Sequence, residues 1–493
     1  MLRGARRGSE SAATGRSLDE TARRRNDKRL SKIALLIRRE KREGEPNDDQ
    51  TRYQNRALGS TIAQPHYDPL KPRPTGDKVT ESILYAHTLS NGMVLLADPM
   101  PGVQSAAFNL LIPAGAAYEP ADRCGLASML SEWITRGAGD RDSRAILTDL
   151  DNLGVSHGEA ASTVHTSVSG ATLGRNLLPA LAIFADVVLR PTLDDDEIEP
   201  IRALAAQSLQ SLEDDPGSKV IYELRRRHYP DPWGRPAPGS LAGVESTTGE
   251  DMRRFFEARY RPEGAILGVA GAIDWPRLKG EVEALFGDWK PGKGDAIVER
   301  RTGPKHDHIT RETNQIQIAL AYPTETMTSV DYYQARAAVG ILGGFASARL
   351  FTEVREKRGL CYSVGSSYET HKNFAAVLCH AGTAADRAQQ TLDVTLAEID
   401  RLHREGVEAH ELDMMRAGLK SSLIMQQESS MNRASAMTAD WYFLGRVRPL
   451  DEIAAKLDGL SAKSINEYLS RRPPADPTIL TLGPKPLAIT KGA

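Results

Sequence analysis

The sequence predicts an α+β fold of two homologous domains, each a mostly antiparallel sheet with helices packed on one side. Three observations lead to this fold class. Short apolar strand patterns and longer amphipathic helix patterns are mixed within each half, and the whole pattern restarts after residue 312. Two segments, TTGEDMRRFFEARYRPEGAILGVAG and LSAKSINEYLSRRPPADPTILTLGP, also repeat each other as helix, Pro-containing turn and strand, which aligns Ile266 with Ile479.

The first 75 residues are predicted to be a disordered basic arm and linker. Residues 1–56 contain 16 Lys or Arg and 9 Asp or Glu, and residues 63–77 are rich in proline. Two other interpretations stay open for this segment. Ser17 to Glu20 fits a capping box that opens a basic helix, and the Arg-rich start resembles a mitochondrial presequence.

The first domain is predicted over residues 76–290. It begins with two strands joined by an Asn-Gly turn in HTLSNGMVLLADP, followed by the apolar strand SAAFNLLIPAG. The segment CGLASMLSEWITRG, from Cys124, then places its apolar residues at helical spacing, which predicts a helix with one buried face. Further helices are predicted at 141–153, 174–189, 196–213 and 248–260, and a strand at 265–273.

Residues 291–312 are predicted to be a linker because Pro, Gly and charged residues replace the apolar pattern. The second domain, 313–493, repeats the order of the first. Its strands are predicted in NQIQIALAYP, CYSVGSSYE, FAAVLCHAG and TILTLG. Its helices are predicted in YYQARAAVGILGG and at 384–404, 409–426 and 448–470.

Composition excludes several classes of function. The net charge is −2 and the excess of basic residues lies in the N-terminal arm, so we expect no nucleic-acid partner. The apolar runs are about a dozen residues long, too short for a membrane span. Cys124, Cys361 and Cys379 lack paired or metal-type spacing, which favours a reducing compartment and hence the cytoplasm, with mitochondria as the alternative.

The quoted segments resemble the pitrilysin/insulinase-like zinc metallopeptidases, in the short class that includes mitochondrial processing peptidase subunits and bc1 core proteins. The resemblance covers about residues 84–488. It rests on LSNGMVLLADP, AGAAYEPADRCGLASMLSEWITRG, RYRPEGAILGVAG, SARLFTEVREKRGLCYSV and the closing LGP. It implies two peptidase-like domains and a peptide substrate.

Active members of this family carry H-x-x-E-H on the first helix and a glutamate about 75 residues later, which together hold zinc and supply the base. At the ligand positions this chain has Ser128 and Glu132, and at the base position it has Ser131. The distal position falls at Gln207 and Ser208. The resemblance therefore implies a degenerate zinc site, with no metal, no cofactor and no catalytic residue of this chain's own.

Other candidate sites are less favoured by their patterns. His306, Asp307 and His308 lie in the predicted linker and are expected to be a solvated polar patch. Four more histidines are expected to be surface or satisfied residues rather than ligands; these are His157, His165, His403 and His410. Cys124 and the serines of the first helix have no neighbouring base that could activate a nucleophile.

The segment FTEVREKRGLCYSV contains Arg355 and, seven residues on, Tyr362. In the family such a pair binds the substrate backbone near the scissile carbonyl, where the donors can stabilise a developing oxyanion. The resemblance thus implies that Arg355 and Tyr362 bind substrate. The alternative is that Arg355 pairs with Glu353 or Glu356 and that Tyr362 is a half-buried strand residue.

The sequence therefore favours a non-catalytic, peptide-binding subunit that completes the active site of a zinc-bearing homologous partner in a heterodimer. The zinc would belong to that partner. Two alternatives stay open. One is a structural core-type subunit without a peptidase role, and the other is a peptidase with an unrecognised site.

Overall fold

The computed structural model describes residues 84–292, 294, 297–300 and 303–489. Every element below belongs to one compact unit, Glu81–Ala493. The predicted basic arm, its capping box and the presequence-like start lie outside the described residues.

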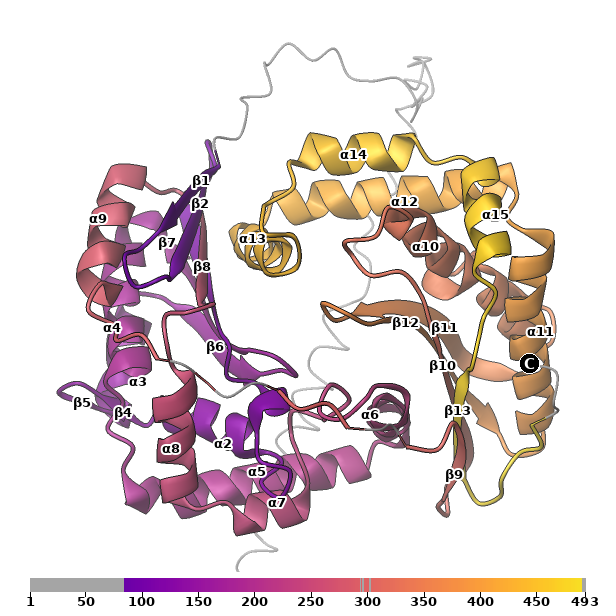
Figure 1. Cartoon of the computed structure of the whole chain (residues 1–493), viewed down its shortest axis with the longest axis horizontal. Helices are drawn as coiled ribbons and strands as arrows, with labels where there is room; N and C mark the ends of the chain where they lie inside the picture. The colour runs from indigo at the N-terminus through magenta and orange to yellow at the C-terminus, as the bar shows by residue number, and fades with distance from the viewer. Residues whose placement is uncertain (1–83, 293, 295–296, 301–302, 490–493) are drawn as a thin grey trace, which may run out of the picture. The chain divides into compact units, whose positions relative to one another are not determined.

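The first half of this unit forms a mixed sheet. Among the described residues it has six strands in the order β1-β2-β8-β3-β7-β6, and β2 and β8 are its parallel pair (Figure 1). The strands are β1 (Tyr85–Thr88), β2 (Val94–Pro99), β3 (Ser105–Ile112), β6 (Ser156–Ala161), β7 (Thr166–Leu173) and β8 (Ile266–Gly271). A small hairpin, β4 (Gly137–Ala138) and β5 (Arg141–Asp142), lies apart from it. The predicted opening hairpin is present as β1 and β2.

Helices of the first half cover one face of this sheet and form the larger core with it. They are α2 (Leu126–Trp133), α3 (Ser143–Asn152), α4 (Leu177–Leu189), α5 (Ile198–Glu213), α7 (Leu241–Ser246), α8 (Gly249–Arg259) and α9 (Trp275–Phe286). The first half also contains α6 (Pro216–His228), whose buried apolar residues belong to a different cluster. Five of the first-half helices, α3, α6, α7, α8 and α9, begin after a residue whose side chain accepts a hydrogen bond from a free N–H group of the first turn. Thr248, for example, forms a capping box with Asp251 at the start of α8.

The second half forms its own mixed sheet, with five strands in the described residues, in the order β11-β12-β10-β13-β9. The strands are β9 (His306–Thr310), β10 (Gln315–Pro323), β11 (Cys361–Thr370), β12 (Ala375–Ala384) and β13 (Thr478–Gly483). The helical segments are α10 (Tyr332–Val339), η4 (Gly340–Gly344), η5 (Phe351–Glu356), α11 (Ala388–Glu405), α12 (Ala409–Gln427), α13 (Ser430–Leu444), α14 (Leu450–Asp458) and α15 (Ala462–Arg471).

The two halves repeat each other element by element. Without β1, the first sheet reads β2-β8-β3-β7-β6, which matches β9-β13-β10-β12-β11 in the second, and β9 and β13 are again parallel. Ile266 pairs with β3 and Ile479 pairs with β10 at equivalent places. The predicted internal repeat and the predicted α+β class are therefore confirmed.

Two of the predicted segments have a different structure from the one expected. Part of the expected linker, His306–Thr310, is strand β9, since it pairs in parallel with β13. The helix expected at 448–470 is two helices, α14 and α15, because Gly459 ends the first and Ser461 caps the second.

In each half, one helix packs on the sheet of the other half (Figure 1). Helix α6 packs on β10 and β13, and α13 packs on β3 and β8. Apolar side chains fill both contacts, with Val220 and Leu224 on α6 and Ala434 and Met437 on α13. Neither helix was predicted from the sequence. They form a layer on the face of each sheet that the sequence prediction had left without helices.

Polar contacts accompany both exchanged helices. Arg433 of α13 forms a buried ion pair with Asp98 of β2, and Asn109 of β3 donates to the Thr438 hydroxyl over 2.8 Å. On the other side, His228 of α6 lies 3.0 Å from the hydroxyl of Thr478 in β13. These groups are buried, so each relies on its partner across the two halves.

The His228 contact predicts an acid-dependent loss of stability. Burial, with a smaller effect of the Lys305 charge, lowers the pKa of His228 to about 4, against about 6.5 in an unfolded chain. The unfolded state therefore binds more protons between these pH values, and the free energy of unfolding falls by up to about 1.4 kcal/mol per pH unit as pH drops. We expect His228→Gln to lose less stability than wild type between pH 7 and pH 4.5 in urea titrations.

The control for this prediction is His306→Gln, which changes an exposed histidine on β9. That variant should keep the wild-type pH dependence. Equal pH dependence for His228→Gln and wild type would contradict the assignment of the loss to His228.

Candidate functional site

Helix α2 packs on the core through the apolar face that its sequence predicts. Leu126, Met129, Leu130 and Trp133 are all fully buried in the core of the first half. Gly125, directly before the helix, has a φ of 110°, a conformation that favours glycine. The polar side of α2 consequently faces away from this core.

A buried carboxylate holds the first turn of α2. Glu119 accepts hydrogen bonds from the backbone N–H groups of Gly125 at 3.0 Å and Ala127 at 2.7 Å. Burial raises the pKa of Glu119 to about 8, although these two N–H groups and Arg235 act in the opposite direction. The carboxyl group thus satisfies N–H groups that a helix start leaves without partners.

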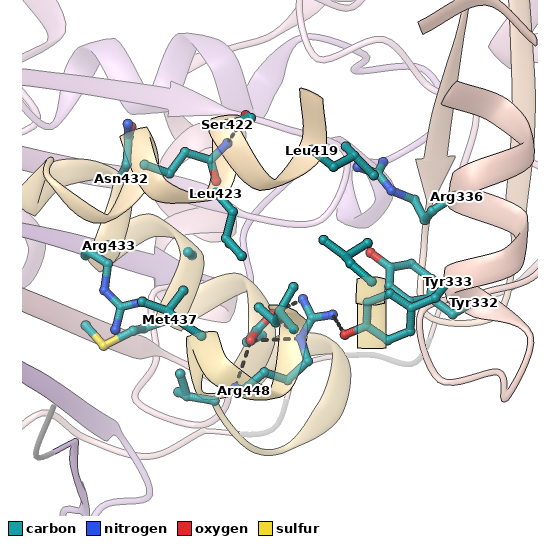
Figure 2. Close-up of a pocket in the computed structure, with 17 residues that line it drawn as sticks. Tyr332, Tyr333, Arg336, Leu419, Ser422, Leu423, Asn432, Arg433, Met437 and Arg448 are labelled. Carbon is teal, nitrogen blue, oxygen red and sulfur yellow. Dashed lines mark hydrogen bonds and ion pairs between the residues drawn. The ribbon is translucent and has the colours of Figure 1, made fainter. Parts of the chain in front are cut away.

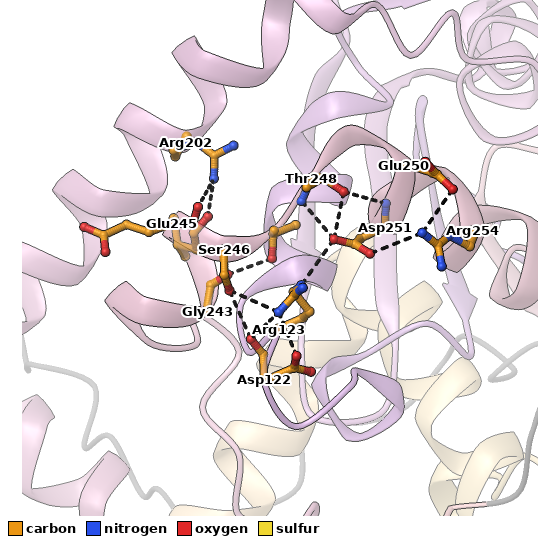
Figure 3. Close-up of polar contacts among 12 residues, drawn as sticks. Asp122, Arg123, Arg202, Gly243, Glu245, Ser246, Thr248, Glu250, Asp251 and Arg254 are labelled. Atoms are coloured by element: carbon orange, nitrogen blue, oxygen red, sulfur yellow. Dashed lines mark hydrogen bonds and ion pairs between the residues drawn. The ribbon is translucent and has the colours of Figure 1, made fainter.

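The loop before α2 is tied to α7 and α8 by a polar network (Figure 3). Arg123 donates to Asp251 at 3.2 Å and to the Asp122 carboxylate at 2.7 Å, and Ser246 donates to the Asp122 carbonyl. On the other side of α7, Arg202 of α5 donates to the carbonyls of Val244 and Glu245. The helices that carry the predicted site positions are therefore fixed relative to one another.

A cavity of about 300 Å³ lies between α2, α5 and β6, and we call it the α2–α5 cavity. Its lining comprises Ser128, Met129, Ser131, Glu132, Glu159, Ala160, Ala161, Ile201, Leu204, Ala205, Ser208, Tyr222, Ala237 and Pro238. Four of the five predicted degenerate zinc-site positions thus meet in one cavity although α2 and α5 are far apart in sequence. Gln207 is exposed and does not line it.

Three polar side chains of the α2–α5 cavity have partners within the chain. The Ser131 hydroxyl donates to the Ser128 carbonyl at 2.8 Å, and Glu132 forms an ion pair with Arg136. Glu159 lies 3.2 Å from the Nδ1 of His157, and burial raises the pKa of this carboxyl group. No hydroxyl here is hydrogen-bonded to a base that would make it a nucleophile.

The donor set of this cavity does not fit a zinc ion. Neutral serine hydroxyls are poor zinc ligands beside imidazole or carboxylate, and the Glu132 carboxylate is neutralised by Arg136. Within the described ranges, no three His, Cys, Asp or Glu residues are grouped so that they could hold a metal ion. We therefore derive no step through zinc bound by this chain.

The cavity opens along a free sheet edge. Strand β6 is the last strand of the first sheet, and in the described part of the chain it pairs with β7 alone. Its residues Glu159, Ala160 and Ala161 line the cavity. An edge strand beside a cavity offers backbone N–H and C=O groups to an extended peptide, while the cavity can receive a side chain.

A second cavity, of about 460 Å³, adjoins the first and shares Ala161, Tyr222 and Ala237 with it. It reaches the end of β11, where Arg225 of α6 is ion-paired with Glu369. His165 also lines this cavity, with its ring edge-on to Tyr442 at 4.4 Å. Burial lowers the pKa of His165 to about 4, so the ring is neutral at pH 7.

Arg355 and Tyr362 lie together beside the turn from η5 to β11. The Arg355 guanidinium lies 4.5 Å from the ring centre of Phe351 and 5.6 Å from that of Tyr362. Tyr362 is 80% exposed, and Gly359, with a φ of 59°, forms the turn between the two elements. Neither Arg355 nor Tyr362 lines the two cavities described above.

The structure does not contain the ion pair that the alternative interpretation of Arg355 requires. Glu353 instead accepts hydrogen bonds from Lys357 and Arg358, both at 2.7 Å. Among the described residues, Arg355 has no carboxylate within ion-pair distance. Its charged group is therefore available beside an exposed tyrosine.

The remaining candidate histidines are dispersed. His308 of β9 lies 2.8 Å from the Thr481 hydroxyl, and Asp307 pairs with Arg227 rather than with a metal-type neighbour. His403 is hydrogen-bonded to the carbonyl of Ile399, and His410 pairs with Glu408. All three cysteines are free.

Sequence reasoning missed Tyr222 and Arg225, because it missed α6. A signal was present in DDPGSKVIYELRRRH, where Asp215 caps the helix and Pro216 occupies its first turn. Glu159 was missed as well, since an alternating strand pattern is weak around it. Glu159 and Tyr222 line the α2–α5 cavity, and Tyr222 and Arg225 line the adjoining cavity.

Comparisons with known proteins identify the family to which this fold belongs. The family described as Insulinase (Peptidase family M16) matches residues 94–233, and Peptidase M16 inactive domain matches residues 246–419. A Bacillus subtilis protein named uncharacterized zinc protease YmxG is 26% identical over 77% of this chain and 93% of its own length. A Rickettsia bellii protein named uncharacterized zinc protease is 26% identical over 81% of this chain and 97% of its own.

Solved structures show the same fold. A peptidase M16 inactive domain from Pseudomonas fluorescens has a TM-score of 0.76 at 21% identity, over 83% of this chain and all of that one. A chain of Complex III2 from Candida albicans has a TM-score of 0.69 at 18% identity, over 81% of this chain and 95% of that one. The architecture is thus that of the short two-domain peptidase class. The chain belongs to the M16 insulinase family.

No helix in the described part of the chain is long and apolar enough to cross a membrane.

Proposed function

We propose that this chain is a non-catalytic, peptide-binding subunit of an M16 metallopeptidase that completes the active site of a zinc-bearing homologous partner. The observation that carries the proposal is an asymmetry between the halves. Ser128, Ser131 and Ser208 stand in the α2–α5 cavity, where zinc chemistry would require stronger ligands and a base. In the second half, Arg355 stays without a carboxylate partner among the described residues, next to the exposed ring of Tyr362.

Peptide binding is supported by the geometry around β6. An extended peptide can add to the free edge of this strand, and the adjoining cavities can hold its side chains. Arg355 supplies a permanent positive charge and Tyr362 a phenolic donor, the groups that bind a peptide carbonyl or stabilise an oxyanion.

A partner is supported by the relatives. Homologues of this chain are called zinc proteases, and a protein of the same fold is part of Complex III2. In this proposal the zinc and the general base belong to the partner, and this chain binds no zinc of its own. The complex would act in the cytoplasm.

The test mixes this chain with a zinc-bearing M16 homologue from the same organism and measures hydrolysis of unstructured peptides. We expect the complex to cleave and this chain alone to be inactive. Arg355→Ala should lower kcat about 100-fold, the usual effect of removing one oxyanion donor, without preventing complex formation. Tyr362→Phe should lower kcat in the same direction.

The matched control is Arg404→Ala, which removes an exposed arginine of α11. Its complex should be as active as wild type. Failure to form a complex would contradict the proposal. A complex that forms but is unaffected by Arg355→Ala would instead favour a structural core-type subunit, and activity of this chain alone would favour an unrecognised peptidase site.

A further inference from the structure

We propose that a third cavity, among helices α10, α12, α13 and α14, binds a ligand in which a carboxylate stands next to a small apolar group. We call it the α12–α13 cavity. It has a volume of about 220 Å³. The residues that carry the argument are Arg336, Leu419, Leu423, Met437 and Ile453 (Figure 2). This inference is independent of the proposed peptidase role.

The cavity carries an excess of positive charge. Three arginines line it, and two of them are neutralised, since Arg433 pairs with Asp98 and Arg448 with Asp440. The Arg448 guanidinium also donates to the Tyr333 hydroxyl at 3.2 Å. The groups at this end of the cavity are therefore already satisfied.

Arg336 is the exception. Its guanidinium lies 5.1 Å from the ring centre of Tyr368, and no carboxylate in the described part of the chain lies within ion-pair distance of it. Figure 2 shows its side chain reaching from α10 toward Leu419 of α12. A half-buried guanidinium with free donors beside an apolar wall favours a carboxylate, which accepts two hydrogen bonds from its planar fork.

The rest of the wall favours an apolar group. Leu419 and Leu423 come from α12, Met437 from α13 and Ile453 from α14. At about 30 Å³ per water, the volume equals about seven waters, so it suits a group the size of one amino-acid residue. Two sources share this chemistry, namely a free small carboxylic acid and the C-terminal residue of a peptide.

The internal repeat explains why a cavity occurs here. The α2–α5 cavity is lined by β6, α2, α5, α6 and the segment before α7. The α12–α13 cavity is lined by α10, α12, α13 and α14, the counterparts of α2, α5, α6 and α7. Ser208 and Ser422 line the two cavities, and each stands five residues before the last residue of its helix. The fold thus makes a cavity at corresponding helices of the two halves, and the lining side chains differ.

The test measures binding by titration calorimetry to the full chain. The probes are N-acetyl-L-leucine, its amide N-acetyl-L-leucinamide, and the peptide Ala-Ala-Ala-Leu. We expect the acid or the peptide to bind, and the amide to bind at least about tenfold more weakly because it lacks the charge that Arg336 recognises. Stronger binding of the peptide assigns the site to peptide C-termini, and stronger binding of the free acid assigns it to small acids.

Two variants locate the binding. Arg336→Gln removes the charge and Leu423→Trp fills the cavity, and each should weaken acid binding at least about tenfold. Arg404→Gln, on the exposed face of α11, should leave it unchanged. The proposal is overturned if the acid and the amide bind wild type equally, if Arg336→Gln binds as wild type does, or if no probe binds at about 10 mM. The comparison of acid and amide needs no variant, so it holds even if a variant fails to fold.

Discussion

Replacing Arg433 with alanine should lower the free energy of unfolding by about 3–5 kcal/mol. Arg433 of α13 donates its Nε to Asp98 of β2 at 2.9 Å, and Asp98 is only 2% exposed. Without the guanidinium, the Asp98 carboxylate stays buried with no counter-charge, which costs much more than the ion pair contributes. Because α13 belongs to the second half and β2 to the first, the loss should also loosen the contact between the halves.

The measurement is urea unfolding of wild type, Arg433→Ala and the double variant Arg433→Met with Asp98→Leu. The double variant should recover most of the loss, since it leaves no unpaired charge. Arg446→Ala breaks an exposed ion pair with Glu452 and should cost less than about 1 kcal/mol. If Arg433→Ala lowers the free energy of unfolding as little as Arg446→Ala does, the Asp98 carboxylate is hydrated rather than buried.

Trp133→Ala should destabilise the chain by about 3–5 kcal/mol, the usual cost of removing a large buried side chain. Trp133 is 0% exposed, and its Nε1 donates to the carbonyl of Asp194 at 2.9 Å. The substitution leaves a void under α2 and removes the donor to the Asp194 carbonyl. Both effects act on the helix that carries Ser128 and Ser131.

Leu147→Ala is the control for Trp133→Ala. Leu147 is 51% exposed on α3, so its replacement should change the free energy of unfolding by less than about 0.5 kcal/mol. Thermal and urea unfolding measure both variants. If Trp133→Ala unfolds like Leu147→Ala, the packing of α2 described here is wrong.

Strands and most helices could be predicted because their patterns are local. Alternating or continuous apolar runs identified β3, β10 and β13, and the apolar stripe of α2 was correct at each of its buried positions. These patterns are visible in the sequence because each element buries its own large side chains.

Helix α13 could not be predicted in this way. Its face toward the first sheet mixes small and polar residues, such as Ala434 and Thr438, with the apolar Met437. The reason is its close approach to the sheet: a Cβ on Gly268 of β8 would lie 2.7 Å from the Ala434 carbonyl. A larger apolar residue would not fit at position 434, so the apolar stripe is interrupted and the periodic signal of an amphipathic helix is weak.

The candidate site was only partly predictable. The resemblance identified Ser128, Ser131, Glu132 and Ser208, and the structure brings these residues to one cavity. Tyr222 and Arg225 depend on α6, and the α12–α13 cavity depends on four helices whose contacts no local pattern encodes. The functional roles of Arg355 and Tyr362 stay predictions.

For this protein, the sequence alone was sufficient for the fold class, the internal repeat and the family resemblance, because apolar periodicity and motifs are properties of consecutive residues. The tertiary structure decided how the halves exchange α6 and α13, which cavities form, and which charges stay unpaired. These features arise where residues hundreds of positions apart pack together. Which residues become partners, as Arg433 and Asp98 do, is therefore determined by how whole helices and sheets pack together.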